Sequence, residues 1–466
     1  MSPDRPADPD SPDAAAGSPA GGELRRGLNA WDTTLLVLGL VLGGGIFLTP
    51  ASIARALPSA PWILAVWIVG GVLSIFGGLV YAELGAMMPR AGGMYVYIRE
   101  AFGSLPAFLY AWVAYFVILA GAGAAVAVGF AEYLSVFFPS LGTKRLLFSA
   151  AGIPISAGQL VAVAAVLLLS ATHYVGIKEG SRIQGFFTFL IVLALGAMLV
   201  GGAVVARPLR SPAPAAGPIG VAAFGTAMVA VFWVYYGWNE IAAVAGEVDR
   251  PRRNLPFALI LGTGLVTVLY VGVNAVFLKA MTVPELAGAA RPAEIASTRL
   301  FGGGAAAAIA LAITAAAFGC LSASIAPAPR IVYALSRDGL FPARFGRAHP
   351  RFRTPSFAIA VQALWMSLLC LSGRYDQLYT YATFAVILAY TGSGVALFLF
   401  RKNLRDMPRP YRCWGYPVVP GLFVASSVLL AVNTVREQPL ETLSGLAILA
   451  AGVPVYFWMK RAGTAR

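Results

Sequence analysis

Residues 35–50 read Leu-Leu-Val-Leu-Gly-Leu-Val-Leu-Gly-Gly-Gly-Ile-Phe-Leu-Thr-Pro, an apolar run with three glycines at its centre. A glycine in a helix interior costs about 1 kcal/mol relative to alanine, so Gly43-Gly44-Gly45 disfavour a helix by about 3 kcal/mol. A later apolar run is interrupted in the same way by Tyr235-Tyr236-Gly237-Trp238-Asn239. We therefore predict that both runs unwind near their midpoints.

The composition indicates that these runs cross a membrane. The chain is 59% hydrophobic and 12% charged, whereas soluble domains have roughly 45–50% apolar and about 25% charged residues. This excludes a soluble globular enzyme and predicts an all-α polytopic membrane protein. Windows of about 20 apolar residues predict twelve spans, near residues 31–54, 61–88, 105–138, 157–174, 183–206, 218–246, 256–280, 304–336, 356–372, 378–400, 417–434 and 443–459.

The position of the two breaks predicts an internal repeat. Irregular backbone is tolerated at membrane depth only beside protein or a watery cavity, and paired breaks in two halves of a chain are typical of transporters. The first five spans end near Arg207 and precede a Pro-rich connection, so a second five-span unit begins on the opposite membrane face. The predicted divisions are a tail (1–28), two inverted five-helix repeats (29–207 and 218–402) and a C-terminal pair of helices (403–466).

Charge and composition predict the orientation and the character of the tail. Most of the 34 Lys and Arg residues fall between spans on the side of the N-terminus, which places both termini in the cytoplasm and the chain in the plasma (inner) membrane. Residues 1–22 have almost no large apolar side chains, so we expect disorder and no cleaved signal peptide. Cys320, Cys370 and Cys413 are widely spaced, so neither a metal site nor a disulfide framework is expected.

Several motifs in this order resemble those of the amino acid, polyamine and organocation transporter superfamily, specifically its L-amino-acid transporter branch. The resemblance covers most of residues 29–402, and it implies a LeuT-like fold: a 5+5 inverted repeat plus two helices, with helices 1 and 6 discontinuous and no cofactor. The motifs are Gly43-Gly44-Gly45-Ile46-Phe47 with Thr49-Pro50, Tyr81-Ala82-Glu83-Leu84-Gly85, Pro89-Arg90-Ala91-Gly92-Gly93, Gly237-Trp238-Asn239, Arg253-Asn254-Leu255-Pro256 and Ser336-Arg337-Asp338-Gly339.

The chemistry of an amino acid fits two broken helices. Its carboxylate and ammonium are costly to bury without partners. The amides of Gly43, Gly44 and Gly45 would open the second half of span one, where the helix dipole favours an anion. Carbonyls at the two breaks would accept from the ammonium: Val41, Leu42, Trp233, Val234 and Tyr236. The alternative is that these glycines only let helices pack closely.

The side-chain pocket is assigned partly through the resemblance. It implies that Trp233 closes over the substrate as a gate; a packed or lipid-facing tryptophan is the alternative. Asn239 and Ser322 or Ser324 would line the pocket, although such residues also join helices by hydrogen bonds.

Glu240 is an intramembrane carboxylate, which is by default a functional candidate. It could bind a cationic group, carry a proton, or cap the second half-helix, where an acidic residue is favoured. It is the only support for the main rival function, a polyamine or cationic amino acid carrier. A membrane-embedded enzyme is the rival from another class, but the two histidines, His173 and His349, form no metal motif.

Two departures from the family bear on mechanism and partners. Many relatives have a lysine in span five where sodium-coupled cousins hold an ion, and here Ile191 takes that position. A lysine-based mechanism is therefore not carried over, which leaves exchange, facilitated transport or coupling through another group. Heteromeric relatives have a cysteine in the second outer loop, and residues 138–156 contain none. We expect no disulfide-linked heavy chain.

Overall fold

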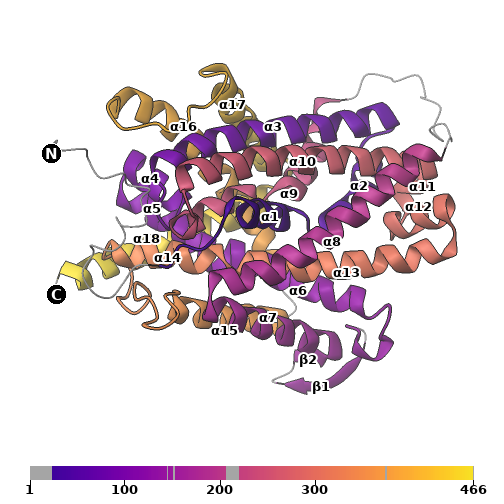
Figure 1. Ribbon diagram of the computed structural model, residues 1–466, viewed down its shortest axis with the longest axis horizontal. Helices are drawn as coiled ribbons and strands as arrows, with labels where there is room; N and C mark the ends of the chain where they lie inside the picture. Colours follow the sequence, from indigo (N-terminus) through magenta and orange to yellow (C-terminus); the bar gives the residue numbers. More distant parts are fainter. Residues whose placement is uncertain (1–23, 144, 151–152, 206–219, 373–374, 465–466) are drawn as a thin grey trace, which may run out of the picture.

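The computed structural model describes residues 24–143, 145–150, 153–205, 220–372 and 375–464. Long helices dominate it (Figure 1). The helices are α1 (Ala30–Val41), α2 (Gly45–Ala56), α3 (Ala60–Met87), α4 (Met94–Phe102), α5 (Ser104–Val113), the π-helix η2 (Ala114–Ile118), α6 (Leu119–Leu134), the 3₁₀-helix η3 (Pro139–Leu141), α7 (Ala157–Val175), α8 (Ile177–Val204), α9 (Val221–Tyr235), the 3₁₀-helix η4 (Trp238–Glu247), α10 (Pro251–Ala280), α11 (Val283–Gly288), α12 (Pro292–Phe301), α13 (Gly303–Ile325), α14 (Pro327–Arg337), α15 (Ser356–Ser372), α16 (Tyr375–Asn403), α17 (Val418–Glu437) and α18 (Pro439–Thr464).

The prediction of a polytopic helical membrane protein is confirmed. Within the described residues, nine helical segments are long and apolar enough to cross a membrane, and the bent pair α1 and α2 makes a tenth. The spans predicted near 105–138 and 304–336 correspond to helical segments of 31 and 35 residues, Ser104–Leu134 and Gly303–Arg337. Two further helices in apolar runs, α9 and α15, are shorter, with 15 and 17 residues.

Some elements were not predicted because they lie outside the apolar windows. Strands β1 (Leu146–Ala150) and β2 (Ile153–Ser156) form an antiparallel hairpin after η3. Between α10 and α13, the short helices α11 and α12 pack beside α2. The Thr282 hydroxyl caps α11 by accepting from the Glu285 amide, which is a local signal that a hydropathy window ignores.

The helices run between two ends of the molecule. In Figure 1, α3, α10 and α13 lie along the long axis; α2, α11 and α12 gather at one end, and α4, α14 and the end of α18 at the other. At the second end, the segment before α1, the end of η4 and α14 are joined by contacts of Leu28, Glu247, Val248 and Arg330, which we call the latch. Leu28 is fully buried and pairs with Val248 as a parallel bridge. The predicted tail at 1–28 thus ends in an ordered contact, while residues 1–23 lie outside the described residues.

The latch also contains a buried ion pair. Arg330 of α14 donates from Nε to Glu247 Oε2 at 2.6 Å and from Nη2 to Glu247 Oε1 at 3.1 Å. Both side chains are almost fully buried. A paired geometry of this kind offsets the cost of removing both charges from water, so the latch fixes the end of η4 to α14.

A second buried carboxylate, that of Glu83, is bound by arginine side chains and a backbone amide. Glu83 of α3 is fully buried and accepts from Arg401 Nε at 3.0 Å and Nη2 at 2.6 Å, from the Cys413 amide at 2.6 Å, and lies 3.5 Å from Arg409 Nε. These contacts join α3 to the end of α16 and to the connection before α17. The buried carboxylates Glu83 and Glu247 are therefore both paired with arginines.

The latch predicts a strong stability effect. The substitution Arg330→Met leaves Glu247 buried without a cation, which typically costs about 3–5 kcal/mol. We expect early thermal aggregation of the detergent-purified variant, measured by size-exclusion chromatography after heating. The double variant Arg330→Met, Glu247→Gln removes the stranded charge and should recover much of the loss. Equal aggregation of both variants would contradict this account of the ion pair.

Candidate functional site

The first helix breaks at the predicted glycines. Asn29 caps α1 by accepting from the Trp31 and Asp32 amides, and α1 ends at Val41. A tight turn follows the end of α1, in which the Gly43 amide donates a hydrogen bond to the Val41 carbonyl at 2.8 Å. Helix α2 then begins at Gly45, with its axis bent by 41° from that of α1. The two halves of this span therefore present a C-terminal and an N-terminal helix end to the middle of the molecule.

The start of α2 offers free hydrogen-bond donors. The first amides of a helix have no intrahelical acceptor, and those of Gly44, Gly45 and Ile46 have no partner among the described residues. Gly45 is exposed and Gly43 and Gly44 are half-buried. A Cβ atom at Gly44 would meet no atom within 4 Å. The space beside Gly44 is therefore open.

The predicted acceptors divide into occupied and free carbonyls. The Val41 carbonyl accepts both from the Gly43 amide and from the Tyr270 hydroxyl, at 2.7 Å. The Trp233 carbonyl accepts from the Tyr236 amide at 3.2 Å. By contrast, the carbonyls of Leu42, Val234 and Tyr236 have no partner among the described residues.

The second break lies at Tyr236 and Gly237. Gly237 has φ 121°, a conformation that L side chains rarely adopt. Helix α9 ends at Tyr235, and the chain resumes as η4, which stays 3₁₀ for ten residues. Such long 3₁₀ stretches are uncommon and often mark a hinge or strain. This glycine therefore permits a sharp change of direction that a larger residue would resist.

The two breaks lie against each other. A Cβ built on Gly45 would lie 3.3 Å from Val234 Cγ2, and one on Gly237 would lie 2.9 Å from the Leu40 carbonyl carbon. Helix α1 packs on η4 while α2 packs on α9. The free amides of α2 and the free carbonyls at the end of α9 are thereby brought to one region.

A polar network follows the second break. Tyr236 Oη and Asn239 Nδ2 both donate to Glu240 Oε1 at 2.7 Å. Tyr390 Oη of α16 donates to Asn239 Oδ1 at 2.5 Å. Asn239, Glu240 and Tyr390 are almost fully buried. The carboxylate is thus held by neutral donors from the break and from η4, and Tyr390 of α16 in turn holds Asn239.

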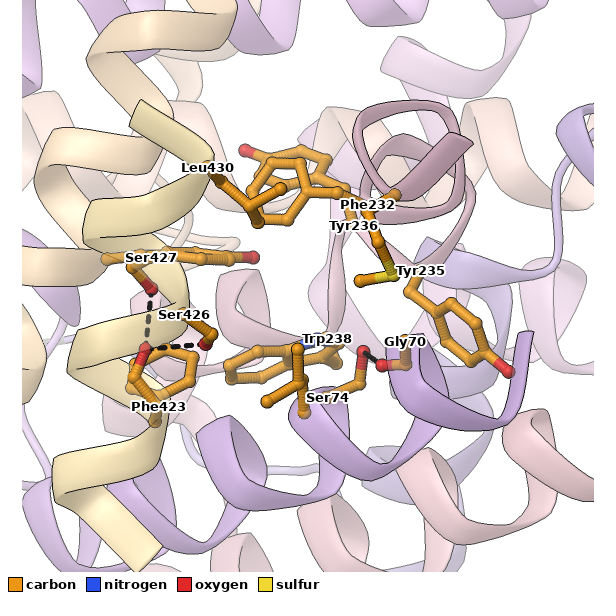
Figure 2. A pocket seen from close by; sticks show the side chains of 13 residues that line it. Gly70, Ser74, Phe232, Tyr235, Tyr236, Trp238, Phe423, Ser426, Ser427 and Leu430 are labelled. Carbon is orange, nitrogen blue, oxygen red and sulfur yellow. Dashed lines mark hydrogen bonds between the residues drawn. The ribbon is translucent and has the colours of Figure 1, made fainter. Parts of the chain in front are cut away.

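A small apolar cleft borders this network at Tyr236 and Tyr390. It lies between α3, α9, α16 and α17. Figure 2 shows Phe232 and Tyr236 on one side and Trp238 on the other. Ser74, Ser426 and Ser427 each donate to a carbonyl of their own helix, so the lining offers few free polar atoms. None of the three predicted glycines lines this cleft.

The remaining predicted residues are placed as follows. Trp233 is half-buried beside Phe232 and Tyr236, with ring centroids at 6.3 and 5.5 Å. Ser322 Oγ lies 3.1 Å from His173 Nε2, and Ser324 Oγ donates to the Cys320 carbonyl at 2.7 Å. Both serines are therefore engaged with helices rather than with the breaks. Ile191 is buried within α8, and no group of three potential metal ligands occurs among the described residues.

Three residues that contribute to the break region were not predicted from the sequence. Ile46 adds a free amide, which the rule that the first amides of a helix lack partners could have indicated. Tyr270 and Tyr390 bond to the break region from distant spans. Their only signal is that a tyrosine hydroxyl within an apolar run needs a partner, and this does not identify the partner.

Comparison of the sequence with known proteins identifies its family. A family model described as "Amino acid permease" matches residues 28–457. The chain belongs to the amino acid permease family. It falls within the amino acid, polyamine and organocation transporter superfamily, in the L-amino-acid transporter branch, so the resemblance seen in the motifs is confirmed.

Individual relatives are similar over nearly their whole length. The serine/threonine exchanger SteT of Bacillus subtilis is 29% identical, with 94% of this chain and 98% of the relative aligned. The human cystine/glutamate transporter is 28% identical over 93% of this chain and 85% of its own. The rat large neutral amino acids transporter small subunit 2 is 30% identical, covering 98% and 84%. All three are transporters by name.

The polar network predicts that loss of the Tyr390 hydroxyl lowers the thermal stability of the protein. Tyr390→Phe keeps the ring and removes the donor to Asn239, leaving a buried amide oxygen unpaired at a cost of about 1–3 kcal/mol. We expect a lower thermal midpoint for the purified protein, measured by intrinsic fluorescence. Tyr416→Phe changes a more exposed tyrosine outside the network and should have little effect. An unchanged midpoint for Tyr390→Phe would contradict the network as a stabilising feature.

Proposed function

We propose that this protein is a secondary amino acid transporter that works by alternating access, with the substrate held between the two helix breaks. The observation that supports this most directly is the contact of the breaks, Gly45 against Val234 and Gly237 against Leu40. Two unwound segments that meet within a membrane bundle provide free donors and free acceptors in one place. Membership of the amino acid permease family gives the same class of substrate.

The end groups of an amino acid fit these two sets of atoms. Its carboxylate would bind the amides of Gly44 and Gly45, at the positive end of the α2 dipole. The Gly43 amide would join them by leaving its turn with Val41. The ammonium would donate to the carbonyls of Leu42, Val234 and Tyr236, with those of Val41 and Trp233 available once their present bonds open.

We assign the pocket around the substrate side chain in part. Trp233 would close over the substrate as the gate, because it lies on the last turn of α9 beside Tyr236. Asn239 would line the pocket from η4. Ser322 and Ser324 would have to release their present partners to reach a substrate, so their bonds favour the alternative that they join helices.

The proposed topology completes the described spans to twelve. Helix α9 with η4, and α15, would be the remaining two crossings. The repeats would be residues 29–207 and 218–402, inverted in a LeuT-like 5+5 arrangement, followed by two helices in 403–466, with both termini cytoplasmic in the plasma (inner) membrane. No disulfide-linked heavy chain is proposed, because Cys320, Cys370 and Cys413 are all buried and residues 138–156 lack cysteine.

The mode of coupling that we propose is exchange or facilitated transport. Ile191 is apolar and buried, so it provides neither the charge nor the proton site of a lysine at this position. One relative, SteT, is named an exchanger. Exchange needs only that the loaded carrier reorients readily.

Exchange can be tested directly in liposomes. Purified protein should take up labelled serine or leucine in a saturable manner, and unlabelled internal amino acid should accelerate that uptake. A channel would show neither saturation of uptake nor acceleration of uptake by internal amino acid. No saturable uptake of any amino acid would overturn the proposed function.

A methyl group at the first break tests the substrate site. Gly44→Ala places Cβ in open space, so folding should be unaffected while the methyl obstructs carboxylate binding. We expect KM for amino acid uptake to rise by about tenfold, the equivalent of about 1.4 kcal/mol. Gly196→Ala, in α8 and also without a neighbour within 4 Å of the added Cβ, is the matched control. Equal KM values in both variants would contradict the assignment of this site.

A further inference from the structure

Three carboxylates are buried in the described structure, and they differ in one respect. Glu83 is paired with Arg401 and Arg409, and Glu247 is paired with Arg330. Glu240 is only 3% exposed, yet it forms no ion pair with a described lysine, arginine or histidine. Its partners are the neutral Tyr236 and Asn239.

This difference has an energetic meaning. A charge buried without a counter-charge is costly, typically by several kcal/mol, even where neutral donors contact it. Intramembrane carboxylates that persist in such surroundings generally belong to a substrate or ion pathway. The fold solves the problem with arginine at two of its three buried carboxylates and leaves the third open. Glu240 is therefore available to a positive partner that the described residues do not provide.

The position of Glu240 indicates which part of a ligand would reach it. The carboxylate lies three residues beyond Gly237, and a 3₁₀-helix rises about 2.0 Å per residue, which gives about 6 Å along η4. The free amides of Gly44 and Gly45 and the Val234 carbonyl lie at the breaks themselves. Both donors to the carboxylate bind one oxygen, Oε1, so Oε2 has no partner among the described residues. Glu240 would thus lie within reach of the side chain of an amino acid bound by its end groups at the breaks.

We propose that Glu240, positioned by Tyr236, Asn239 and Tyr390, forms an acidic subsite for a cationic group on the substrate side chain. The chemical class is an ammonium or guanidinium on a flexible stem, as in lysine or arginine. This inference rests on the proposed transport function and adds the substrate class. The hydroxyl of Tyr236 belongs both to the subsite and to the second break, so the subsite is connected to the point where the helix unwinds.

The test compares cationic and neutral substrates in the full-length protein. Proteoliposomes with wild type, Glu240→Gln and Glu437→Gln would be assayed for uptake of labelled lysine, arginine, leucine and serine. Glu437→Gln removes the same charge from an exposed position at the end of α17 and is the matched control. We expect Glu240→Gln to lower kcat/KM for lysine and arginine by at least about tenfold, as expected for losing a charged hydrogen bond, while leucine and serine change less than twofold.

Binding provides a second measurement that does not depend on turnover. In detergent, lysine should raise the thermal midpoint of wild type and of Glu437→Gln, but not that of Glu240→Gln, whose monodispersity is checked by size-exclusion chromatography. If Glu240→Gln does not fold, the wild type still decides: lysine and arginine must bind, and must compete with labelled leucine.

The outcomes separate this inference from the proposed function. Saturable neutral uptake without any binding of lysine or arginine overturns the subsite and leaves amino acid transport intact. Neutral uptake that is driven by a pH gradient in wild type, and loses that drive in Glu240→Gln, also overturns it in favour of a proton site. An equal loss for cationic and neutral substrates overturns it in favour of a structural role. Absence of all saturable uptake overturns the transport function itself.

Discussion

The structure depends on one constraint: backbone amides and carbonyls within a membrane must find partners, because lipid offers none. Regular helices meet this requirement along most of the chain. Where α1 gives way to α2, and α9 to η4, it is met only in part, by the turn between Gly43 and Val41, by the Tyr270 hydroxyl and by the bond from Tyr236 to Trp233. The amides and carbonyls without partners at the two breaks lie together. The interruption of each helix therefore contributes to one shared polar region.

The sequence predicts this region because its cause is local. Three successive glycines and an isolated Gly237 weaken helix wherever they occur, and no tertiary information is needed to find them. The partners could not be predicted, because they depend on which spans become neighbours. Tyr270 and Tyr390 lie 229 and 151 residues from the groups to which they donate. Ser322 illustrates the same limit, since its contact with His173 depends on how α13 packs on α7 and α8.

The buried carboxylates of the described structure differ in whether they have a counter-charge. Glu83 and Glu247 carry their arginines at one end of the molecule, where they join α3 to α16 and η4 to α14. Such pairs add rigidity where both charges are already compensated. Glu240 lies in the same 3₁₀-helix as Glu247, seven residues earlier, but has only neutral donors. A single short element therefore contains one carboxylate paired with an arginine and one that we propose binds a ligand.

The latch shows how the two broken helices act as a unit. Leu28, just before α1, bonds through its backbone to Glu247 and Asp249, just after η4, and Leu40 meets Gly237 at the other end of the same pair of half-helices. Helix α1 and η4 are thus joined at both ends and can move together without losing these contacts. Their attachments to the rest of this end include the Glu247–Arg330 ion pair and the bond from the Gly92 amide to the Ala243 carbonyl. Opening towards that end must therefore either separate this buried ion pair or carry it along, and only separation would add the free energy of the pair to the barrier.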